Sequence, residues 1–252
     1  MSLKTKSPWI VFSLLFFFIH FNVFSKTLIH AGNLIDGKSD VVQSKMSIII
    51  DGNQITEVIK GYIPTNNYKN YIDLKNYTVL PGLMDMHVHF GGEYQSKAEA
   101  PTKVEREMEA ILATQHALVT FRSGFTTVRQ VGDSGMVAIS LRDAINNGKV
   151  IGPRIFAAGK TIATTGGHAD PTNGKALDDY SYPIPEQGVV NGPYEVYTAV
   201  RQRYKDGADG IKITVTGGVL SQAKSGDNPQ FTQEEVDAVV NAARDYGMWV
   251  AV

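Results

Sequence analysis

Residues 79–90 read Val-Leu-Pro-Gly-Leu-Met-Asp-Met-His-Val-His-Phe, and the rest of the chain is organised around this stretch. Its apolar and β-branched residues predict a strand that is interrupted by a turn at Pro81 and Gly82. Alternate side chains of a strand share a face, so His87 and His89 should point the same way, about 6–7 Å apart. Two imidazoles at this spacing can reach one metal ion at roughly 2.0–2.1 Å. Asp85 shares their face and could orient a ligand or bind in the second shell.

A structural role for the two histidines is the alternative interpretation. Two histidines separated by one residue on an apolar strand can also be buried and hydrogen-bonded to the backbone. The setting favours a metal site, because an apolar strand rarely directs two imidazoles toward its carboxyl end unless that end binds something.

The composition is that of a globular protein with enough apolar material for a sizeable core. The chain has 252 residues, of which 43% are hydrophobic and 19% are charged, and its formal net charge is −1. The near-zero charge and the lack of a basic block or phosphate-binding glycine loop argue against a nucleic-acid partner. Cysteine is absent, which excludes disulfides, thiolate ligands and cysteine nucleophiles. A metal would therefore need histidine, carboxylate or a modified side chain.

Residues 1–25 are predicted to be a signal peptide. Lys4 and Lys6 precede an apolar run at 9–24, and cleavage is expected after Ser25. An uncleaved membrane anchor is the alternative, because the run approaches the length that can span a bilayer. No cysteine follows the run, which excludes a lipoprotein anchor. We therefore expect a secreted or periplasmic protein that does not contact the membrane after cleavage.

Residues 26–78 are predicted to form a small all-β domain. A strand begins at Thr27, and residues 46–59 predict a hairpin that turns at 51–53. A further short strand is expected at 71–74. His30 lies inside this domain and is interpreted as structural.

Residues 79–252 are predicted to alternate between strands and helices. Helices are expected at 102–122, 136–147, 193–206 and 232–246, the last with Thr232 as N-cap and Glu235 at N3. Strands are expected at 125–132, 152–159, 210–218 and 248–252, with a long loop at 160–191. Four βα units and the start of a fifth predict parallel strands with the spacing of a (β/α)8 TIM barrel. The fold class expected is therefore α/β, with roughly the first half of a barrel after the β domain.

Lys212 is the one charged residue of the predicted fourth barrel strand. A lone lysine in a strand often extends to solvent or pairs with a carboxylate, and that alternative stays open. Its depth resembles that of His87 and His89, so it is a candidate for the same site. An ammonium beside a metal would be repelled, unless it were deprotonated or converted to an anion.

His168 lies in the loop after the third strand, which is the end of a barrel where sites are built. Gly166 and Gly167 precede it and allow close backbone approach. A loop histidine that bonds to the backbone is the alternative. His116, on the first helix, is expected to be packed or solvent-facing.

Four stretches together resemble the metal-dependent amidohydrolase superfamily, and within it the imidazolonepropionase-like and Xaa-Pro dipeptidase (prolidase-like) branch. They are Leu-Pro-Gly-Leu-Met-Asp-Met-His-Val-His at 80–89, Gly-Phe-Thr-Thr-Val-Arg at 124–129, Thr-Thr-Gly-Gly-His at 164–168, and Ala-Asp-Gly-Ile-Lys-Ile-Thr-Val-Thr-Gly-Gly-Val-Leu-Ser at 208–221. The resemblance covers about residues 27–252. Its motifs are specific for the superfamily and less so for the substrate.

The resemblance implies a binuclear metal site and a small amide or dipeptide substrate. His87 and His89 would ligate the more buried metal, and Lys212 would be carboxylated by CO2 so that its carbamate bridges two divalent ions, commonly zinc. His168 would be the catalytic and substrate-binding residue that contacts the substrate or its carbonyl. A hydroxide shared by the metals would attack the amide carbon. The β domain would match half of the small sandwich that flanks such barrels.

The chain also departs from the family pattern. Family members take histidines from the fifth and sixth strands and an aspartate from the eighth, and residues 249–252 end before the first of these. We therefore expect an N-terminal fragment of a hydrolase of C–N bonds that is inactive or weak alone. A cyclic amide hydrolase of imidazolonepropionase type stays open, as does a catalytically inactive half-barrel binding protein. A homo-oligomer is among the expected assemblies.

Overall fold

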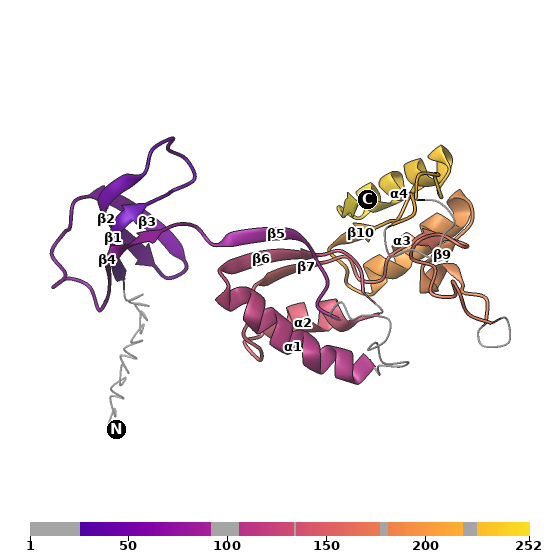
Figure 1. The fold of residues 1–252 in the computed structure, drawn as a ribbon, viewed down its shortest axis with the longest axis horizontal. Coiled ribbons are helices and arrows are strands. Elements are labelled where there is room, and N and C mark those ends of the chain that lie inside the picture. The colour runs from indigo at the N-terminus through magenta and orange to yellow at the C-terminus, as the bar shows by residue number, and fades with distance from the viewer. Residues whose placement is uncertain (1–25, 92–105, 134, 177–180, 219–225) are drawn as a thin grey trace, which may run out of the picture. The chain divides into compact units, whose positions relative to one another are not determined.

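The computed structural model describes residues 26–91, 106–133, 135–176, 181–218 and 226–252 (Figure 1). The chain forms two compact units, 1–81 and 82–252. The predicted signal peptide at 1–25 and the first four residues of the helix expected at 102–122 lie outside the described residues. Within the described ranges, every helix is too short or too polar to cross a membrane.

The first unit is a four-stranded sheet in the order β3-β2-β1-β4. Its strands are β1 (Thr27–Leu34), β2 (Gln43–Asp51), β3 (Gln54–Lys60) and β4 (Asn70–Val79). The β2-β3 pair confirms the predicted hairpin, and its turn contains Gly52 at a φ of +59°, which favours glycine. β1 pairs antiparallel with β2 and parallel with β4. One face of the sheet buries a small core of Ala31, Leu34, Met46 and Ile48.

The stretch that begins at Val79 belongs to two strands in two different units. Thr78 and Val79 pair with Asn33 and Leu34 of β1, so they end β4. The histidine-bearing strand β5 (Leu83–Val88) starts only after the break. Pro81 has no backbone N–H to give to a ladder, which is why pairing stops there. The sequence interpretation of one interrupted strand was wrong at this point, because the partner of Thr78 and Val79 lies far back in the chain.

The second unit alternates parallel strands with helices, which confirms the predicted mixed α/β class. In chain order it contains β5, α1 (Arg106–Arg122), β6 (Phe125–Gln130), α2 (Val137–Asn146), β7 (Arg154–Ala157), α3 (Pro193–Lys205), β10 (Gly210–Lys212), α4 (Gln233–Asp245) and β11 (Trp249–Ala251). β5-β6-β7 and β10-β11 form parallel sheets. The backbone N–H of Asp209 donates to the Ala157 carbonyl (2.8 Å) and so connects the end of β7 with the start of β10.

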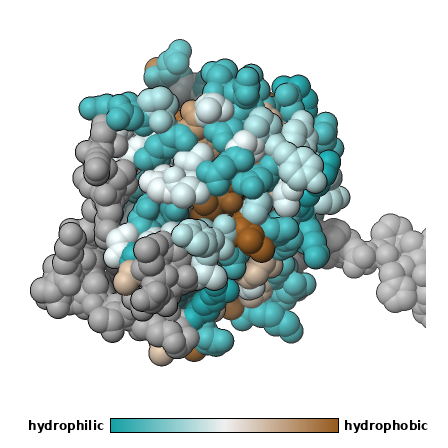
Figure 2. Space-filling view, turned by 90° about the vertical axis from the view of Figure 1, so that its right-hand side faces the viewer, coloured by the Kyte–Doolittle hydropathy of each residue, from teal (hydrophilic) through white to brown (hydrophobic). Residues whose placement is uncertain are grey.

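Two hydrophobic cores lie where the helices cover these strands. One contains Val128, Ile139, Leu141 and Ile155 and joins α1 and α2 to β6 and β7. The other contains Val200, Ile211, Ile213 and Val239 and joins α3 and α4 to β10. On the side drawn in Figure 2, hydrophilic residues predominate and hydrophobic ones gather near the centre.

The region 160–191 is more structured than the long loop that the sequence predicts. It contains β8 (Ala163–Thr164), β9 (Val189–Val190) and the 3₁₀ helix η2 (Pro185–Gln187). β8 and β9 pair in parallel, and the Ile162 N–H donates to the Lys212 carbonyl (2.8 Å). The prediction of a continuous loop was therefore wrong. Strands of two residues carry no periodicity that a sequence pattern could reveal.

Candidate metal and substrate site

A β-bulge places the two histidines at the end of β5. Asp85 pairs with Val128 and Val88 with Gln130, so the two residues Met86 and His87 lie opposite the single residue between them on β6. Bulges of this kind redirect side chains and are frequent beside sites. The imidazole rings of His87 and His89 lie side by side, with centroids 5.2 Å apart and planes inclined by 65°. Both residues are solvent-exposed.

His89 is oriented by a backbone carbonyl. Its Nδ1 lies 3.0 Å from the carbonyl oxygen of Gly132, to which it can donate. Donation from Nδ1 leaves the lone pair of Nε2 for a metal, which is the usual arrangement of histidine ligands. Asp85 acts on the backbone instead, because its Oδ1 accepts the N–H of His87 (3.0 Å).

Lys212, on β10, lies beside Gly132, whose carbonyl orients His89. A Cβ atom on Gly132 would lie 4.0 Å from Lys212 Cγ, so the lysine stem passes the residue that orients His89. The side chain is partly buried. Burial, followed by the positive charge of Arg129, lowers the pKa of Lys212. Both effects favour the neutral amine over the ammonium.

The pKa of His87 is lowered as well. Burial is the largest cause, and the charges of His89, Lys212 and Arg129 add to it, while Asp85 opposes them. A lowered pKa favours the neutral imidazole, which is the form that binds metals. The structure thus brings together His87, His89 and Lys212, three of the four residues that the sequence predicts for the site.

Arg129 is a residue of this site that the sequence interpretation missed. It is the one charged residue of β6, as Lys212 is of β10. Its guanidinium carbon lies 5.2 Å from the centroid of the Trp249 ring on β11, a cation–π contact. The lone charge in an apolar strand was a signal that could have identified it.

His168 is held by its own set of neighbours. Its backbone N–H donates to Gln230 Oε1 (2.8 Å), and its ring packs so closely on Gly218 that a Cβ atom there would lie 2.7 Å from the ring Cε1. Asn173 Nδ2 donates to the carbonyl of Gly167 (2.7 Å) and fixes the preceding turn. Among the described residues, nothing pairs with the buried Nδ1 of His168. These contacts place His168 beside the segment that follows Lys212.

The described donors fit part of a metal site. His87 and His89 offer two adjacent imidazole rings at the end of β5, and the lowered pKa of His87 favours its neutral form. Lys212 fits as a neutral amine or as a carbamate, and an ammonium would not fit. Within the described ranges, no group of three or more histidine, aspartate or glutamate side chains could hold a metal. The described residues therefore supply part of the ligand set of such a metal site.

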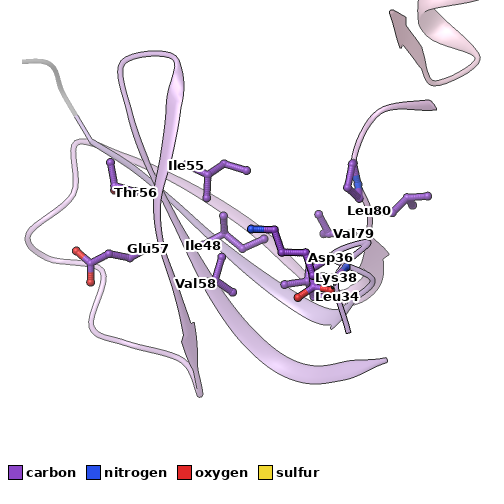
Figure 3. A pocket seen from close by; sticks show the side chains of 11 residues that line it. Leu34, Asp36, Lys38, Ile48, Ile55, Thr56, Glu57, Val58, Val79 and Leu80 are labelled. Atoms are coloured by element: carbon purple, nitrogen blue, oxygen red, sulfur yellow. Dashed lines mark hydrogen bonds between the residues drawn. The ribbon is translucent and has the colours of Figure 1, made fainter. Parts of the chain in front are cut away.

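Two cavities elsewhere in the described residues have no histidine in their lining. One of about 450 Å³ lies in the first unit, lined mainly by apolar side chains from the sheet and by Asp36 and Lys38 (Figure 3). Hydrogen bonds from Ser39 and Lys38 lower the pKa of Asp36, and its carboxylate already accepts them. The other cavity, of about 550 Å³, surrounds Arg142, which bonds Asp209 at 2.7 Å. Arg142 and Asp209 are therefore already paired with each other.

Comparisons with known proteins show the family to which the chain is similar. The model of the Amidohydrolase family matches residues 78–252. A crystal structure of a Xaa-Pro dipeptidase with bound methionine is 83% identical, with a TM-score of 0.89 over 90% of this chain and 56% of that chain. A prolidase complexed with N-methylphosphonate-L-proline is 32% identical, with a TM-score of 0.76 over 90% of this chain and 55% of that chain.

A curated relative is similar over most of this chain. The ochratoxinase of Aspergillus niger is 27% identical over 237 residues, which are 86% of this chain and 48% of that protein. The chain spans about half the length of the relatives that it matches. The part that it spans includes His87 on β5 and His89 directly after it, Arg129 on β6 and Lys212 on β10.

Proposed function

This chain belongs to the amidohydrolase family, and from that premise we propose that it carries the first ligands of a metal-dependent hydrolase that cleaves amide or peptide C–N bonds, with Xaa-Pro dipeptides as substrates. The observation that carries the proposal is the adjacent pair His87 and His89, with Nδ1 of His89 on the Gly132 carbonyl. The choice of Xaa-Pro dipeptides is supported by the 83% identity to a Xaa-Pro dipeptidase over 90% of this chain.

His87, His89 and the carbamate of Lys212 would supply the first of the ligands that hold two divalent ions, expected to be zinc. When bound, such ions polarise a carbonyl and lower the pKa of water, so that a nucleophile exists at neutral pH. The chain's own residues prepare this site. The Gly132 carbonyl can hold the His89 tautomer. Burial, and after it the charge of Arg129, lowers the pKa of Lys212, so more of its amine is neutral and able to add CO2.

His168 is proposed to contact the substrate. It follows two glycines in a turn fixed by Asn173, and Gln230 holds its backbone. A histidine held in this way could donate a hydrogen bond to the carbonyl oxygen of the scissile bond, where negative charge develops during attack. We extend the proposal to location: a signal peptide at 1–25 would deliver the protein to the periplasm or the medium.

The test combines metal binding with turnover. The 252-residue chain is purified and its zinc affinity measured, and hydrolysis of Met-Pro is then assayed with and without the C-terminal half of the similar dipeptidase. We expect zinc binding by the chain alone, and turnover only in the complemented sample. A doubly substituted His87→Ala/His89→Ala chain should lose both, whereas His30→Ala, in the other unit, should keep both.

Zinc binding that survives the double substitution would refute the assignment of the two histidines. Turnover of Met-Ala equal to that of Met-Pro in the complemented sample would refute the substrate class. Zinc binding without turnover under every condition would favour the binding-protein alternative.

A further inference from the structure

We propose that Arg129 and Gln130, neighbours on β6, are positioning residues that hold the backbone on both sides of His87 and His89 in a metal-binding geometry. The inference rests on the proposed metal site and deepens it. Neither residue is assigned a contact with metal or substrate. Their side chains bond backbone groups of the histidine segment where the regular pairing of β5 with β6 is interrupted and where β5 ends.

Arg129 secures the segment before the histidines. The bulge places Met86 and His87 opposite Arg129 alone, which disrupts regular pairing at this point. Arg129 Nε donates to the carbonyl of Met86 at 2.9 Å, so a side chain satisfies the acceptor that the bulge displaces. The same guanidinium lies over the Trp249 ring, which limits its movement on the other side. The residue directly before His87 is therefore fixed by β6.

Gln130 secures the segment after the histidines. β5 ends at Val88, so the N–H of Phe90 has no strand partner within β5 and β6. Gln130 Oε1 accepts that N–H at 2.9 Å in a buried setting. Phe90 itself is 3% exposed and packs in the core under α1 and α2. The residue directly after His89 is thereby held against the core.

The same amide also fixes the acceptor of His89. Gln130 Nε2 donates to the carbonyl of Gly132 at 3.3 Å, the oxygen that lies 3.0 Å from His89 Nδ1. A carbonyl has two lone pairs and can accept both bonds. Gln130 is fully buried, at 0% exposure, and both ends of its amide are paired. A buried polar network that is fully satisfied is rigid, and breaking it leaves unpaired backbone groups.

Loss of such outer contacts typically lowers metal affinity by about 10–100-fold. We therefore expect Gln130→Met, which keeps the length of the side chain and removes both hydrogen bonds, to weaken zinc binding by a factor in that range. Arg129→Lys keeps the positive charge and removes the planar guanidinium on Trp249. It should weaken zinc binding less, because Lys can still reach the Met86 carbonyl with poorer geometry.

The experiment uses the 252-residue chain and measures zinc affinity by competition with a chromogenic chelator. The visible spectrum of the Co²⁺-loaded chain reports ligand geometry, and ¹⁵N shifts of His89 in the metal-free chain report its tautomer. Val239→Ala is the matched control, because Val239 is fully buried in the core under α3 and α4. It should lower stability and leave zinc affinity within about twofold, because Val239 lies on α4 and takes no part in the hydrogen bonds of Arg129 and Gln130.

Three results decide the matter. If His87→Ala/His89→Ala leaves zinc binding unchanged, the proposed metal site fails. If that variant loses zinc but Gln130→Met and Arg129→Lys bind it like the wild type, the site stands and the positioning role is overturned. If Val239→Ala weakens zinc as much as Gln130→Met, the loss reflects stability and the positioning role is again overturned. Should Gln130→Met fail to fold, Arg129→Lys, at a partly exposed position, decides alone.

Discussion

At the scale of single residues, one buried guanidinium of the second unit bonds backbone atoms from distant segments. It belongs to Arg203 on α3, at 2% exposure. Its Nη1 donates to the carbonyl of Lys160 (3.2 Å), its Nη2 donates to that of Glu186, and its Nε lies 3.3 Å from Asp206. The guanidinium of α3 thus bonds Lys160, shortly after β7, and Glu186 in η2.

Arg203→Met should destabilise the second unit by about 3–5 kcal/mol, because it leaves the carbonyls of Lys160 and Glu186 without their donor and removes the ion pair with Asp206. Urea unfolding followed by circular dichroism measures the change. Arg201→Met, an exposed position on the same helix, should change the free energy of unfolding by less than about 0.5 kcal/mol. Equal losses in the two variants would contradict the assigned role of Arg203.

The carboxylate of Asp133 should make the folding stability depend on pH. Its Oδ2 accepts the N–H of Ala138 at the start of α2 (2.7 Å), and its Oδ1 accepts that of Gly135 (2.9 Å). Burial nevertheless raises its pKa above the ordinary value of 3.8. The folded state therefore holds this proton more tightly than the unfolded chain does, and stability falls as pH rises from 3.8 through the folded-state pKa.

Asp133→Asn cannot ionise, so the slope of stability against pH in that window should become flatter. Urea midpoints of wild type and variant, measured from pH 3.5 to pH 7, test this. Asp237→Asn removes an exposed carboxylate of α4 and serves as the charge control. A wild-type slope that persists in Asp133→Asn would assign the pH dependence to another group.

At the scale of elements, Glu235 joins two helices. The predicted capping box of α4 is confirmed: Thr232 Oγ1 accepts the N–H of Glu235 (3.3 Å), and Glu235 Oε2 accepts that of Thr232 (2.8 Å). Glu235 Oε1 also accepts the N–H of Gly192 at the start of α3 (2.6 Å). The second contact could not be read from a local capping motif.

Thr232→Ala should cost about 1 kcal/mol, the usual value of an N-cap. Glu235→Ala should cost more, about 2–4 kcal/mol, because it leaves two backbone N–H groups unpaired in a partly buried setting. Urea unfolding of both variants gives the difference. Glu234→Ala, on the exposed side of the same turn, is the control. A cost of Glu235→Ala no larger than that of Thr232→Ala would mean that the bond to Gly192 adds nothing.

At the scale of the whole molecule, each of the two units has its own hydrophobic core. Units with separate cores generally unfold as separate cooperative steps. We expect two transitions in scanning calorimetry of the full chain. Ile48→Ala should lower the free energy of unfolding of the first unit by about 2–4 kcal/mol and shift its transition to lower temperature. Val239→Ala should do the same to the second unit by a smaller amount. A single transition shifted by both variants would show that the units unfold together.

The positions of the helices and of the first-unit hairpin were readily predicted. α2, α3 and α4 begin and end within about two residues of the predicted bounds, because apolar periodicity, Pro193 and the Thr232 cap act within one or two turns. The turn between β2 and β3 was predictable for the same reason, because it depends on neighbouring residues in the sequence. His87, His89, Lys212 and His168 were singled out because residues of their types are unusual in apolar strands and glycine-rich loops, and their assigned roles stay predictions.

What the sequence by itself determined is therefore the order and type of most elements, while the metal-binding role of His87, His89 and Lys212 stays a prediction. Only the tertiary structure decided that Thr78 and Val79 pair with β1, that Met86 and His87 form a bulge, and that β8 pairs with β9. It also decided the contact of Arg129 with Met86, which lies 43 positions away in the chain. The physical reason is the sequence separation of the interacting residues. Periodicity and helix caps depend on residues a few positions apart, whereas bulges, register and side-chain bonds to the backbone depend on partners that only folding brings near.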